Sequence, residues 1–399
     1  MRKVLGIDPG SRSIDLCLLC DGEVCGEASI DTSEASKDPY KVVDIVESIG
    51  GSDLVVLPSG YGVEITYLDE IPEDVFIDWF FMFILISDQE EIKRLASQGV
   101  EGAFIYDAMA KIVYEFKKRR VKGVFIPGVI NLPTIPVYKK INKIDMGAAD
   151  KLAVTVLGVH ELSEKHDVDY EDVNYIHVEM GYGYNAVIAV RNGRIVDGVG
   201  GSLMPGPAFL TSGSLDLEIV QFIKRFDKSD VFSSGCSSIT KIFSLEEWFR
   251  KIRDNDLAKT CFESMIDSVV KIVYSMTSVV KDPMEILVSG RVGRRDEVFN
   301  ILRDRLKDVA PVDLMRGLEG SKLVKETAQG YAVVGDGLLG GRFERLIRHM
   351  KINEATGSSL DYVVLPRFLS TDLGRRYLRL RKFLKSQAYN INMLKGLLL

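Results

Sequence analysis

The stretch IDPGSRSIDLCLLCDGEV at residues 7–24 has a counterpart 171 positions later, VEMGYGYNAVIAVRNGRI at residues 178–195. The two stretches align without a gap, and the matched pairs are Asp8 with Glu179, Gly10 with Gly181, Asp21 with Asn192, Gly22 with Gly193 and Val24 with Ile195. In each copy an apolar strand ends in an acidic residue, a tight turn follows, and a second strand leads to Asp-Gly or Asn-Gly, which favours a type I′ hairpin. The repeat predicts two lobes of one α/β architecture, although a simple β-meander also places an acid, a glycine and a turn dipeptide at such intervals.

The elements between and after the two copies follow from hydrophobic periodicity and turn residues. The sequence predicts buried strands over Val75–Ser87, a stretch too short to span a bilayer. Further expected elements are a strand over Gly123–Asn131, a loop over 133–145, a long amphipathic helix over Met146–Lys165, helices over Asp216–Phe226, Leu257–Val280 and Arg295–Val309, a strand and glycine turn over 285–293, and a helix over Lys325–Leu339. The helices at Met146–Lys165 and Lys325–Leu339 are expected to bridge the lobes.

This reading divides the chain into five parts: a first lobe at 1–145, a bridging helix at 146–170, a second lobe at 171–324, a segment with the second bridging helix at 325–365, and a basic tail at 366–399. The tail carries leucines at helical spacing beside Lys and Arg. It is compatible with a docking or membrane-surface helix, and equally with a terminal helix that packs on its own lobe and exposes a basic face.

Composition narrows the class of protein. The chain has 399 residues and a formal net charge of −6, and 46% of its residues are hydrophobic, which suits two or three folded domains. The acidic balance makes nucleic acid an unlikely partner. The N-terminal MRKVLGIDPG lacks the apolar stretch of a signal peptide, and no transmembrane segment is expected, so the sequence predicts a cytoplasmic protein. Homo-oligomerisation is compatible with the sequence.

Three cysteines lie close together in the first repeat, at Cys17, Cys20 and Cys25. Such a group raises the question of a metal or iron–sulfur site. Cys17 and Cys20 are three residues apart on an expected strand, where this spacing places side chains on opposite faces. The sequence therefore favours small buried hydrophobic residues over metal ligands.

The first turn has the features of a phosphate-binding loop. Gly10 allows a tight turn, and the backbone amides of Gly10, Ser11 and Arg12 can face an anion. Asp8 stands where the strand ends and is a candidate ligand for Mg²⁺, through water. The alternative interpretation is an acid that caps an ordinary hairpin.

The second turn supplies a matching set, with Glu179 as a second candidate metal ligand and catalytic acid and with Gly181 and Gly183 as loop residues. Two such turns that approach from separate lobes can clamp the β- and γ-phosphates of ATP. The repeat therefore predicts a nucleotide site between the lobes.

These features together resemble the acetate and sugar kinase, heat-shock cognate and actin superfamily. The resemblance rests on the paired turns, the helix between them, LVSGRVG at 287–293 and AQGYAVVGDGLLGG at 328–341. Within that superfamily, LPTIPVYKKINKIDMGAADKLAV at 132–154 and GLLGGRFERLIRHMKINEATGSSLDYV at 337–363 look like an archaeal branch described as butyrate-kinase-like. The resemblance spans residues 3–363.

The resemblance implies two actin-like, ribonuclease-H-like lobes with a nucleotide cleft, and an ATP- and Mg²⁺-dependent kinase that acts on a small-molecule acceptor. The residues it implies are Asp8, Gly10, Ser11 and Arg12 in the first phosphate loop, Glu179, Gly181 and Gly183 in the second, and Ser289, Gly290 and Arg291 beside the adenosine. The second loop departs from the usual pattern, because Met180, Tyr182 and Tyr184 stand in a loop where small hydroxyl residues are usual. Backbone N–H groups would have to replace those hydroxyl donors.

Asp150 is the candidate catalytic base, because GAADKLAV resembles the GADR segment of type III pantothenate kinases, whose Asp is thought to activate an acceptor hydroxyl. An acid favoured by the helix dipole is the alternative. Asp145 is interpreted as a cap. Lys139 and Lys140 are candidate substrate residues, and a solvated basic loop is the alternative for them.

Two further functions stay open. GIDPGSR with an Asp-containing helix also resembles Holliday-junction resolvases, in which Asp8, Asp145 and Asp150, with Glu64 or Asp69, would bind two Mg²⁺ ions. Lobe closure around ATP could instead drive a conformational switch without a phosphorylated product. For a kinase, a hydroxyl acceptor needs a base such as Asp150, whereas a carboxylate acceptor is already ionised and needs positive charge around it.

Overall fold

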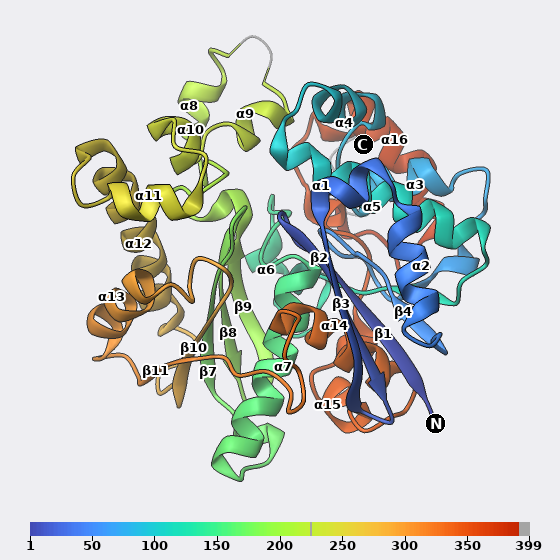
Figure 1. Ribbon diagram of the computed structural model, residues 1–399. Helices are drawn as coiled ribbons and strands as arrows, with labels where there is room; N and C mark the ends of the chain where they lie inside the picture. The colour runs from blue at the N-terminus through green and yellow to red at the C-terminus, as the bar shows by residue number, and fades with distance from the viewer. Residues whose placement is uncertain (224–225, 391–399) are drawn as a thin grey trace.

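The computed structural model describes residues 1–223 and 226–390, which form two mixed β-sheets surrounded by helices (Figure 1). The first sheet has the order β3-β2-β1-β4-β6-β5 and the second has the order β11-β10-β7-β8-β9. The strands are β1 Lys3–Pro9, β2 Ser13–Cys20, β3 Glu23–Asp31, β4 Leu54–Val56, β5 Thr66–Tyr67, β6 Gly123–Phe125, β7 Tyr175–Met180, β8 Asn185–Arg191, β9 Arg194–Gly200, β10 Glu285–Ser289 and β11 Val312–Leu314. The predicted α/β class with two lobes is confirmed.

The sequence repeat is also a repeat of structure. In each sheet an antiparallel three-stranded meander lies beside a parallel neighbour, β4 next to β1 and β10 next to β7. The hairpin residues Asp21-Gly22 and Asn192-Gly193 all have positive φ, as a type I′ turn requires. Both β2–β3 and β8–β9 also shift register at one step, at Leu18/Leu19 and at Ala189/Val190, which are again 171 positions apart. A shared irregularity of this kind is stronger support for duplication than shared turn residues.

Two helices lie between the sheets, α7 at Ala149–His166 and α14 at Glu326–Leu338 (Figure 1). Both were predicted, and each begins and ends within three residues of the expected position. They cross closely because Gly330 has no side chain, and a Cβ atom there would lie 2.3 Å from the backbone oxygen of Ala153. Their buried residues join side chains of both sheets in one hydrophobic core.

The remaining helices pack around the two sheets and against the bridging helices (Figure 1). Those of the first lobe are α1 Thr32–Lys37, α2 Tyr40–Ser48, α3 Phe76–Phe83, α4 Gln89–Ser97, α5 Glu101–Lys118 and α6 Val137–Lys140. Those of the second lobe are α8 Leu217–Val220, α9 Lys228–Phe232, α10 Cys236–Thr240, α11 Leu245–Lys251, α12 Asp256–Met276 and α13 Asp296–Leu306. Two more, α15 Glu344–His349 and α16 Asp372–Leu380, follow α14. No helix within the described residues is long and apolar enough to cross a membrane.

Four local predictions were wrong. The loop expected over 133–145 contains the short helix α6 Val137–Lys140. Val75–Ser87 contains the helix α3 and no strand, because a short run that is apolar on every side fits a buried helix as well as a buried strand. The strand expected over Gly123–Asn131 ends at Phe125. Cys20 and Cys25 are joined in a disulfide, with Cα atoms 5.8 Å apart, because the hairpin brings the ends of β2 and β3 together. Of these three cysteines only Cys17 is a buried free thiol.

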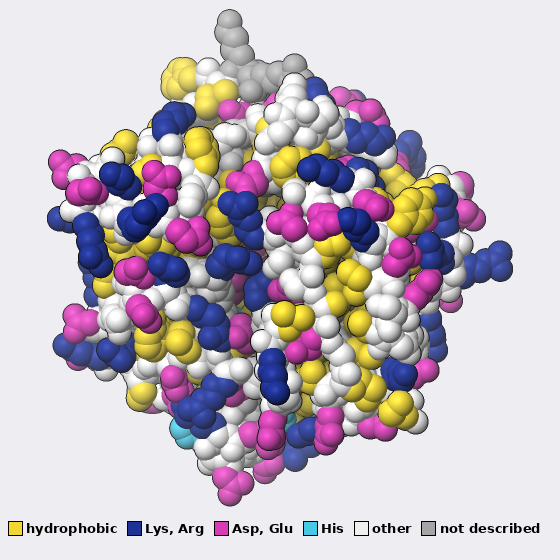
Figure 2. Space-filling view, in the orientation of Figure 1, with side chains coloured by type: hydrophobic (Ala, Val, Ile, Leu, Met, Phe, Trp, Pro, Cys, Tyr) yellow, Lys and Arg dark blue, Asp and Glu magenta, His cyan; other side chains and the backbone are white. Residues whose placement is uncertain are grey.

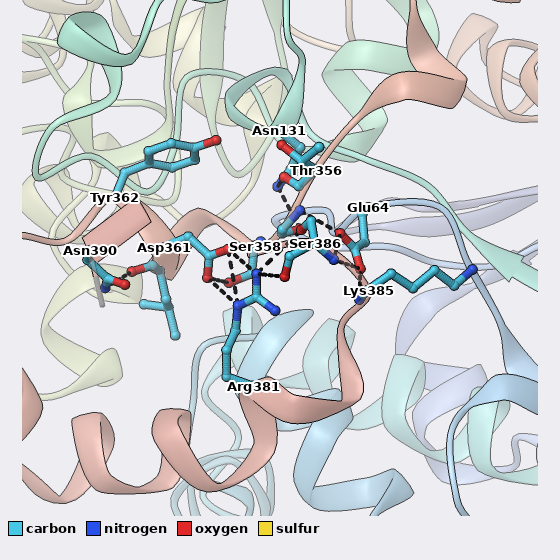
Figure 3. Close-up of polar contacts among 12 residues, drawn as sticks. Glu64, Asn131, Thr356, Ser358, Asp361, Tyr362, Arg381, Lys385, Ser386 and Asn390 are labelled. Atoms are coloured by element: carbon cyan, nitrogen blue, oxygen red, sulfur yellow. Dashed lines mark hydrogen bonds and ion pairs between the residues drawn. The ribbon is translucent and has the colours of Figure 1, made fainter. Parts of the chain in front are cut away.

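The segment after residue 365 packs on the first lobe. The guanidinium of Arg381 donates two hydrogen bonds, of 3.0 and 2.8 Å, to the two carboxylate oxygens of Asp361, and both side chains are buried (Figure 3). Glu64 accepts backbone N–H groups from Gly357 and Ser386 in the same network. The basic face of α16 thus belongs to a packed helix, and residues 391–399 of the tail lie outside the described residues.

Candidate functional site

A cavity of about 150 Å³ opens where the lobes meet, beside the ends of β1 and β7. It is lined by residues of both lobes, and Figure 2 shows a groove on this face with Lys and Arg side chains along it. Its charged lining residues are the acids Asp8, Asp145, Asp150 and Glu179 and the bases Arg12, Lys151, Arg291 and Lys325. The structure therefore brings both predicted loops and Asp150 to one cavity.

The first loop is held by a lysine from the opposite end of the chain. Asp8 is the second-last residue of β1, and its Oδ2 accepts a 2.7 Å hydrogen bond from Nζ of Lys325. The same ammonium lies 3.3 Å from Asp15. Burial raises the pKa of Asp8, and the charge of Lys325 opposes that rise. Lys325 immediately precedes α14, so the second bridging helix delivers this cation to the first loop.

The second loop repeats the arrangement. Glu179 is the second-last residue of β7, and its Oε2 lies 2.9 Å from Nζ of Lys151, the third residue of α7. Lys151 also lies 2.6 Å from Asp150. Burial raises the pKa of Glu179, against the charge of Lys151. Burial lowers the pKa of Lys151, but the carboxylates of Asp150 and Glu179 outweigh that effect, so this ammonium stays charged.

The glycines of both turns keep the space between the loops free of side chains. A Cβ atom on Gly10 would lie 2.5 Å from Nζ of Lys325, and one on Gly183 would lie 2.7 Å from Oγ of Ser11. At Gly183 the second turn therefore comes close to Ser11 of the first, and the two turns face each other across a narrow gap. Backbone turns with that geometry suit an anion such as a phosphate group.

The unusual tyrosine of the second loop joins the lobes. The hydroxyl of Tyr182 accepts a 2.9 Å hydrogen bond from Arg12 of the first loop and donates to the carboxylate of Glu101 on α5 at 3.1 Å. Arg12 also lies over the Tyr182 ring, 4.6 Å from its centroid. These three residues form a latch between the lobes, which we call the Tyr182 latch.

Asp145 is more than the cap that its sequence position suggested. It is buried in the cavity wall, accepts a 3.0 Å hydrogen bond from the N–H of Gly147, and forms no ion pair within the described residues. A Cβ atom on Gly201 would lie 2.2 Å from its carboxylate, so the second lobe approaches it closely. Burial raises the pKa of Asp145 to about 6. That value lies in the range at which a carboxylate can take up and release a proton near neutral pH.

Other predicted residues lie outside the cavity. Lys139 forms an ion pair with Asp197, and the buried ammonium of Lys140 donates to the carbonyl of Leu132 at 2.9 Å. Neither lines the cavity, because short contacts within the first lobe and with β9 hold both side chains. The geometry therefore gives no support to the substrate role that we expected for Lys139 and Lys140.

The predicted adenosine turn is only partly at the cavity. Arg291 lines it, whereas Ser289 is buried in β10 and bonds to His177 at 2.8 Å. Burial lowers the pKa of that histidine to about 3, so it is neutral near pH 7. Gly290 has positive φ, and a Cβ atom there would lie 2.3 Å from the backbone oxygen of Met180, which fixes the turn against the second loop.

Sequence reasoning missed Lys151 and Lys325 as site residues. A signal for both was present, because each stands at the start of a helix, where the dipole disfavours a cation. A lysine at such a position needs an acidic partner from elsewhere in the fold. Here the partners are the acids of the two repeated turns.

Two lobes with repeated turns, joined by helices that cross between the sheets, define the actin-like class of α/β folds. A propionate kinase from Francisella tularensis subsp. tularensis SCHU S4 shares the fold with a TM-score of 0.56 at 13% identity, over 83% of this chain and 98% of that chain. Porphyromonas gingivalis acetate kinase matches with a TM-score of 0.53 at 14% identity, over 85% of this chain and 99% of that chain. Entamoeba histolytica acetate kinase matches with a TM-score of 0.50 at 13% identity, over 77% and 86%.

At these identities the likeness establishes the fold and leaves the activity to the residues of the site. The chain belongs to the family described as "Protein of unknown function (DUF1464)", whose model matches residues 6–365. The actin-like fold that the sequence resemblance implied is thus confirmed.

Proposed function

We propose that this protein is an ATP-dependent phosphotransferase that moves the γ-phosphoryl group of ATP to a small-molecule acceptor. One observation carries the proposal: two acids from the two copies of one turn, each paired with a lysine from a bridging helix, face a single cavity between the lobes. A hairpin acid with a purely structural role would have no reason to recur with its own lysine.

The residues present fit ATP and Mg²⁺. Asp8 and Glu179 offer hard carboxylate oxygens on either side of the gap between the glycine turns, and such oxygens suit Mg²⁺, partly through water. Bound there, Mg²⁺ would neutralise charge on the β- and γ-phosphates. The glycine turns leave room for phosphate oxygens beside backbone N–H groups.

The chain's own lysines complete the anion site. Without nucleotide, Lys325 and Lys151 neutralise Asp8 and Glu179. An incoming triphosphate offers each ammonium a second anionic partner at little displacement, because each already lies at the edge of the cavity. Both ammonium groups would then stabilise the negative charge that develops on the transferred phosphoryl group, and the ion pair with Asp150 would keep Lys151 in position.

Calorimetry with ATP and Mg²⁺ tests the nucleotide site, and Asp8→Ala should weaken binding at least tenfold. Asp44→Ala, on the exposed face of α2, is the matched control and should bind as the wild type does. Equal affinity in Asp8→Ala, or no binding of ATP or ADP to the wild type, would contradict the proposal. Transfer is tested by ³¹P NMR of a phosphorylated product with a panel of short carboxylic acids, as a butyrate-kinase-like activity requires, and of small alcohols.

A second candidate is a nucleotide-dependent switch without a product. The Tyr182 latch favours it, because Arg12 cannot serve the latch and a phosphate group equally well. Nucleotide-driven closure of the lobes with no transfer to any acceptor of the panel would make this the better account. The resolvase-like alternative loses only the acid that would complete its metal set, because Glu64 lies in the network of Figure 3 and neither it nor Asp69 lines the cavity.

A further inference from the structure

The cavity has a second compartment that the phosphate chemistry does not use. Beyond the two turns its wall is apolar and aromatic, and the residues come from the first lobe: Tyr61, Ile84, Leu85, Ile105, Tyr106 and Met109. Ile84, Leu85, Ile105 and Met109 are buried. We call this set the tyrosine compartment.

Backbone hydrogen bonds connect the tyrosine compartment to the start of α7. The N–H of Tyr61 donates to the carbonyl of Ile84 at 3.0 Å, and the N–H of Ala149, the first residue of α7, donates to the carbonyl of Gly60 at 2.9 Å. Gly60 has a φ of 49°, and a Cβ atom there would lie 2.2 Å from the oxygen of Ile84, so this loop requires glycine. The compartment wall is therefore fixed relative to the start of α7.

A short helix of the second lobe covers the outer side. Phe232 of α9 packs edge-on against the Tyr106 ring, with centroids 5.5 Å apart. Lys228 of the same helix donates to the hydroxyl of Tyr61 at 3.3 Å and lies over the Tyr106 ring. This cover separates the compartment from solvent on that side, so a group that enters it exchanges water for aromatic and aliphatic surface.

Asp145 lines the same cavity as the tyrosine compartment and the two glycine turns. The cations that line the cavity are Arg12, Lys151, Arg291 and Lys325, and these belong to the turns and the helix starts. No ion pair within the described residues neutralises Asp145, and Lys228, the cation of α9 that faces it, is engaged with the hydroxyl of Tyr61 and the ring of Tyr106. A carboxylate acceptor in the compartment would therefore meet a buried acid of its own sign.

The apolar side chains of the compartment wall also limit how polar the acceptor can be apart from its reacting group. Each hydroxyl of a sugar that faces Ile84, Leu85 or Met109 would lose water without gaining a partner, at roughly 1–3 kcal/mol. The aliphatic part of the wall is therefore poorly suited to a sugar.

We propose that the acceptor is a small neutral alcohol with an apolar body, which lies in the tyrosine compartment and presents its hydroxyl to Asp145. This inference rests on the proposed phosphotransferase function. In the step, the alcohol oxygen bonds to the γ-phosphorus, the bond from that phosphorus to the bridging oxygen of ADP breaks, and the hydroxyl proton passes to Asp145. The products are a phosphate monoester and ADP. Asp145, rather than Asp150, is then the general base, because Lys151 holds Asp150 in an ion pair.

A matched pair of acceptors tests the substrate class. The protein is incubated with ATP and Mg²⁺ and either 3-methylbutan-1-ol, 3-methylbutanoate or glucose, and ³¹P NMR follows the product. We expect a phosphate monoester from the alcohol, at a rate at least tenfold above that with either other compound. Acyl phosphate from the acid, trapped as a hydroxamate, or glucose phosphate as the main product would overturn the inference and leave the phosphotransferase proposal standing.

Binding without ATP separates the two proposals. Saturation-transfer NMR should detect 3-methylbutan-1-ol on the wild type, and Ile105→Phe, which fills the compartment, should weaken that binding about tenfold. Tyr114→Phe, at an exposed position of the same helix, is the control and should leave it unchanged. Alcohol binding with no transfer to the alcohol would refute the role of Asp145, and the absence of transfer to every acceptor of the panel would also refute the phosphotransferase function. No binding of the alcohol by the wild type would refute the compartment.

The role of Asp145 has its own readout. Asp145→Asn should lower kcat by about 10² to 10⁴ with the alcohol while it leaves the affinity for ATP nearly unchanged, as expected for loss of a general base. In the wild type, kcat/KM should rise with pH as Asp145 loses its proton. Asp150→Asn should show the same rise, and Asp145→Asn should lose it. If instead Asp150→Asn removes that rise and Asp145→Asn keeps it, Asp150 is the base and this part of the inference is wrong.

Discussion

The ammonium group of Lys325 lies 2.7 Å from the carboxylate of Asp8, so the helix that follows the second copy of the repeat reaches back to the turn of the first. The helix that follows the first copy does the reverse, since Lys151 at its start lies 2.9 Å from Glu179 in the second copy. Each bridging helix is thus tied to the loop of the other repeat. Movement of either lobe must therefore change the positions of both acids relative to both cations.

This reciprocal pairing predicts the effect of removing Lys325. Lys325→Met should weaken binding of ATP with Mg²⁺ by about 10- to 100-fold, because a charge-assisted contact to phosphate is worth about 1.5–3 kcal/mol and Asp8 is left without its cation. Calorimetry measures the change. Lys322→Met, an exposed neighbour, should bind ATP as the wild type does. Equal affinity in both variants would remove Lys325 from the anion site.

The buried carboxylate of Asp145 should make folding stability depend on pH. Its pKa is raised to about 6 by burial, so between about pH 4 and 6 the folded protein holds a proton that the unfolded chain has lost, and stability falls as pH rises. The groups that face it are Asp150 and Lys151 of α7, Lys228 of α9, and the side chains of Tyr61 and Tyr184.

Asp145→Asn keeps an oxygen for the N–H of Gly147 and removes the charge. At pH 7.5 the variant should be more stable than the wild type by about 3 kcal/mol, and the difference should vanish near pH 4. Urea unfolding at the two pH values measures it, with Asp44→Asn on α2 as an exposed control. A variant less stable than the wild type at pH 7.5 would mean that Asp145 supports the fold.

The sequence was sufficient for the architecture because the repeat encodes it locally. The Asp-Gly and Asn-Gly dipeptides and the alternation of the flanking strands determine the hairpins, and one duplicated pattern determines both sheets. The two long bridging helices were also predictable, since their apolar periodicity is sustained over several turns. Val75–Ser87 was not predictable, because the short apolar run becomes a helix through packing in the core of the first lobe, which no local pattern records.

The candidate site was predictable only in part for a related reason. Residues that belong to the repeated turns, such as Asp8 and Glu179, carry their own local signal. Lys325 and Asp145 reach the cavity through tertiary packing: Lys325 contacts Asp8, 317 residues away, and Asp145 lies against Gly201 of the second lobe. Lys139 and Lys140 show the opposite case, because they lie close in sequence to Asp145 and Asp150 and yet make their contacts outside the cavity, with Asp197 and with the carbonyl of Leu132.

The C-terminal segment should depend on a single buried ion pair. Arg381→Met leaves the carboxylate of Asp361 buried without its cation, so the free energy of unfolding should fall by about 3–5 kcal/mol. Urea unfolding gives this value, and limited proteolysis should show earlier cleavage after residue 365. Arg375→Met breaks an exposed ion pair with Asp372 and should cost at most about 1 kcal/mol. Similar losses in both variants would argue against a special role for the buried pair.

The Tyr182 latch gives the final prediction, on lobe movement. Tyr182→Phe keeps the ring, whose centroid lies 5.0 Å from that of Phe209, and removes only the hydroxyl that contacts Arg12 and Glu101. The lobes should then separate more readily in the absence of nucleotide. Spin labels at the exposed Lys93 and Lys259, each replaced by Cys, report the distance between lobes.

Without nucleotide, Tyr182→Phe should give a longer and broader distance distribution than the wild type, and ATP with Mg²⁺ should narrow both to one shorter distance. The affinity of Tyr182→Phe for ATP should be a few-fold higher than that of the wild type, because Arg12 is then free to bind a phosphate group. The gain is small because the Arg12 side chain is 42% exposed. If a phosphorylated product forms at the wild-type rate in this variant, the latch serves closure and not chemistry. If the distance between the labels is the same with and without ATP in both proteins, the lobes do not close around nucleotide. Neither the switch nor a kinase that closes would then describe the molecule, and any transfer would have to occur between fixed lobes.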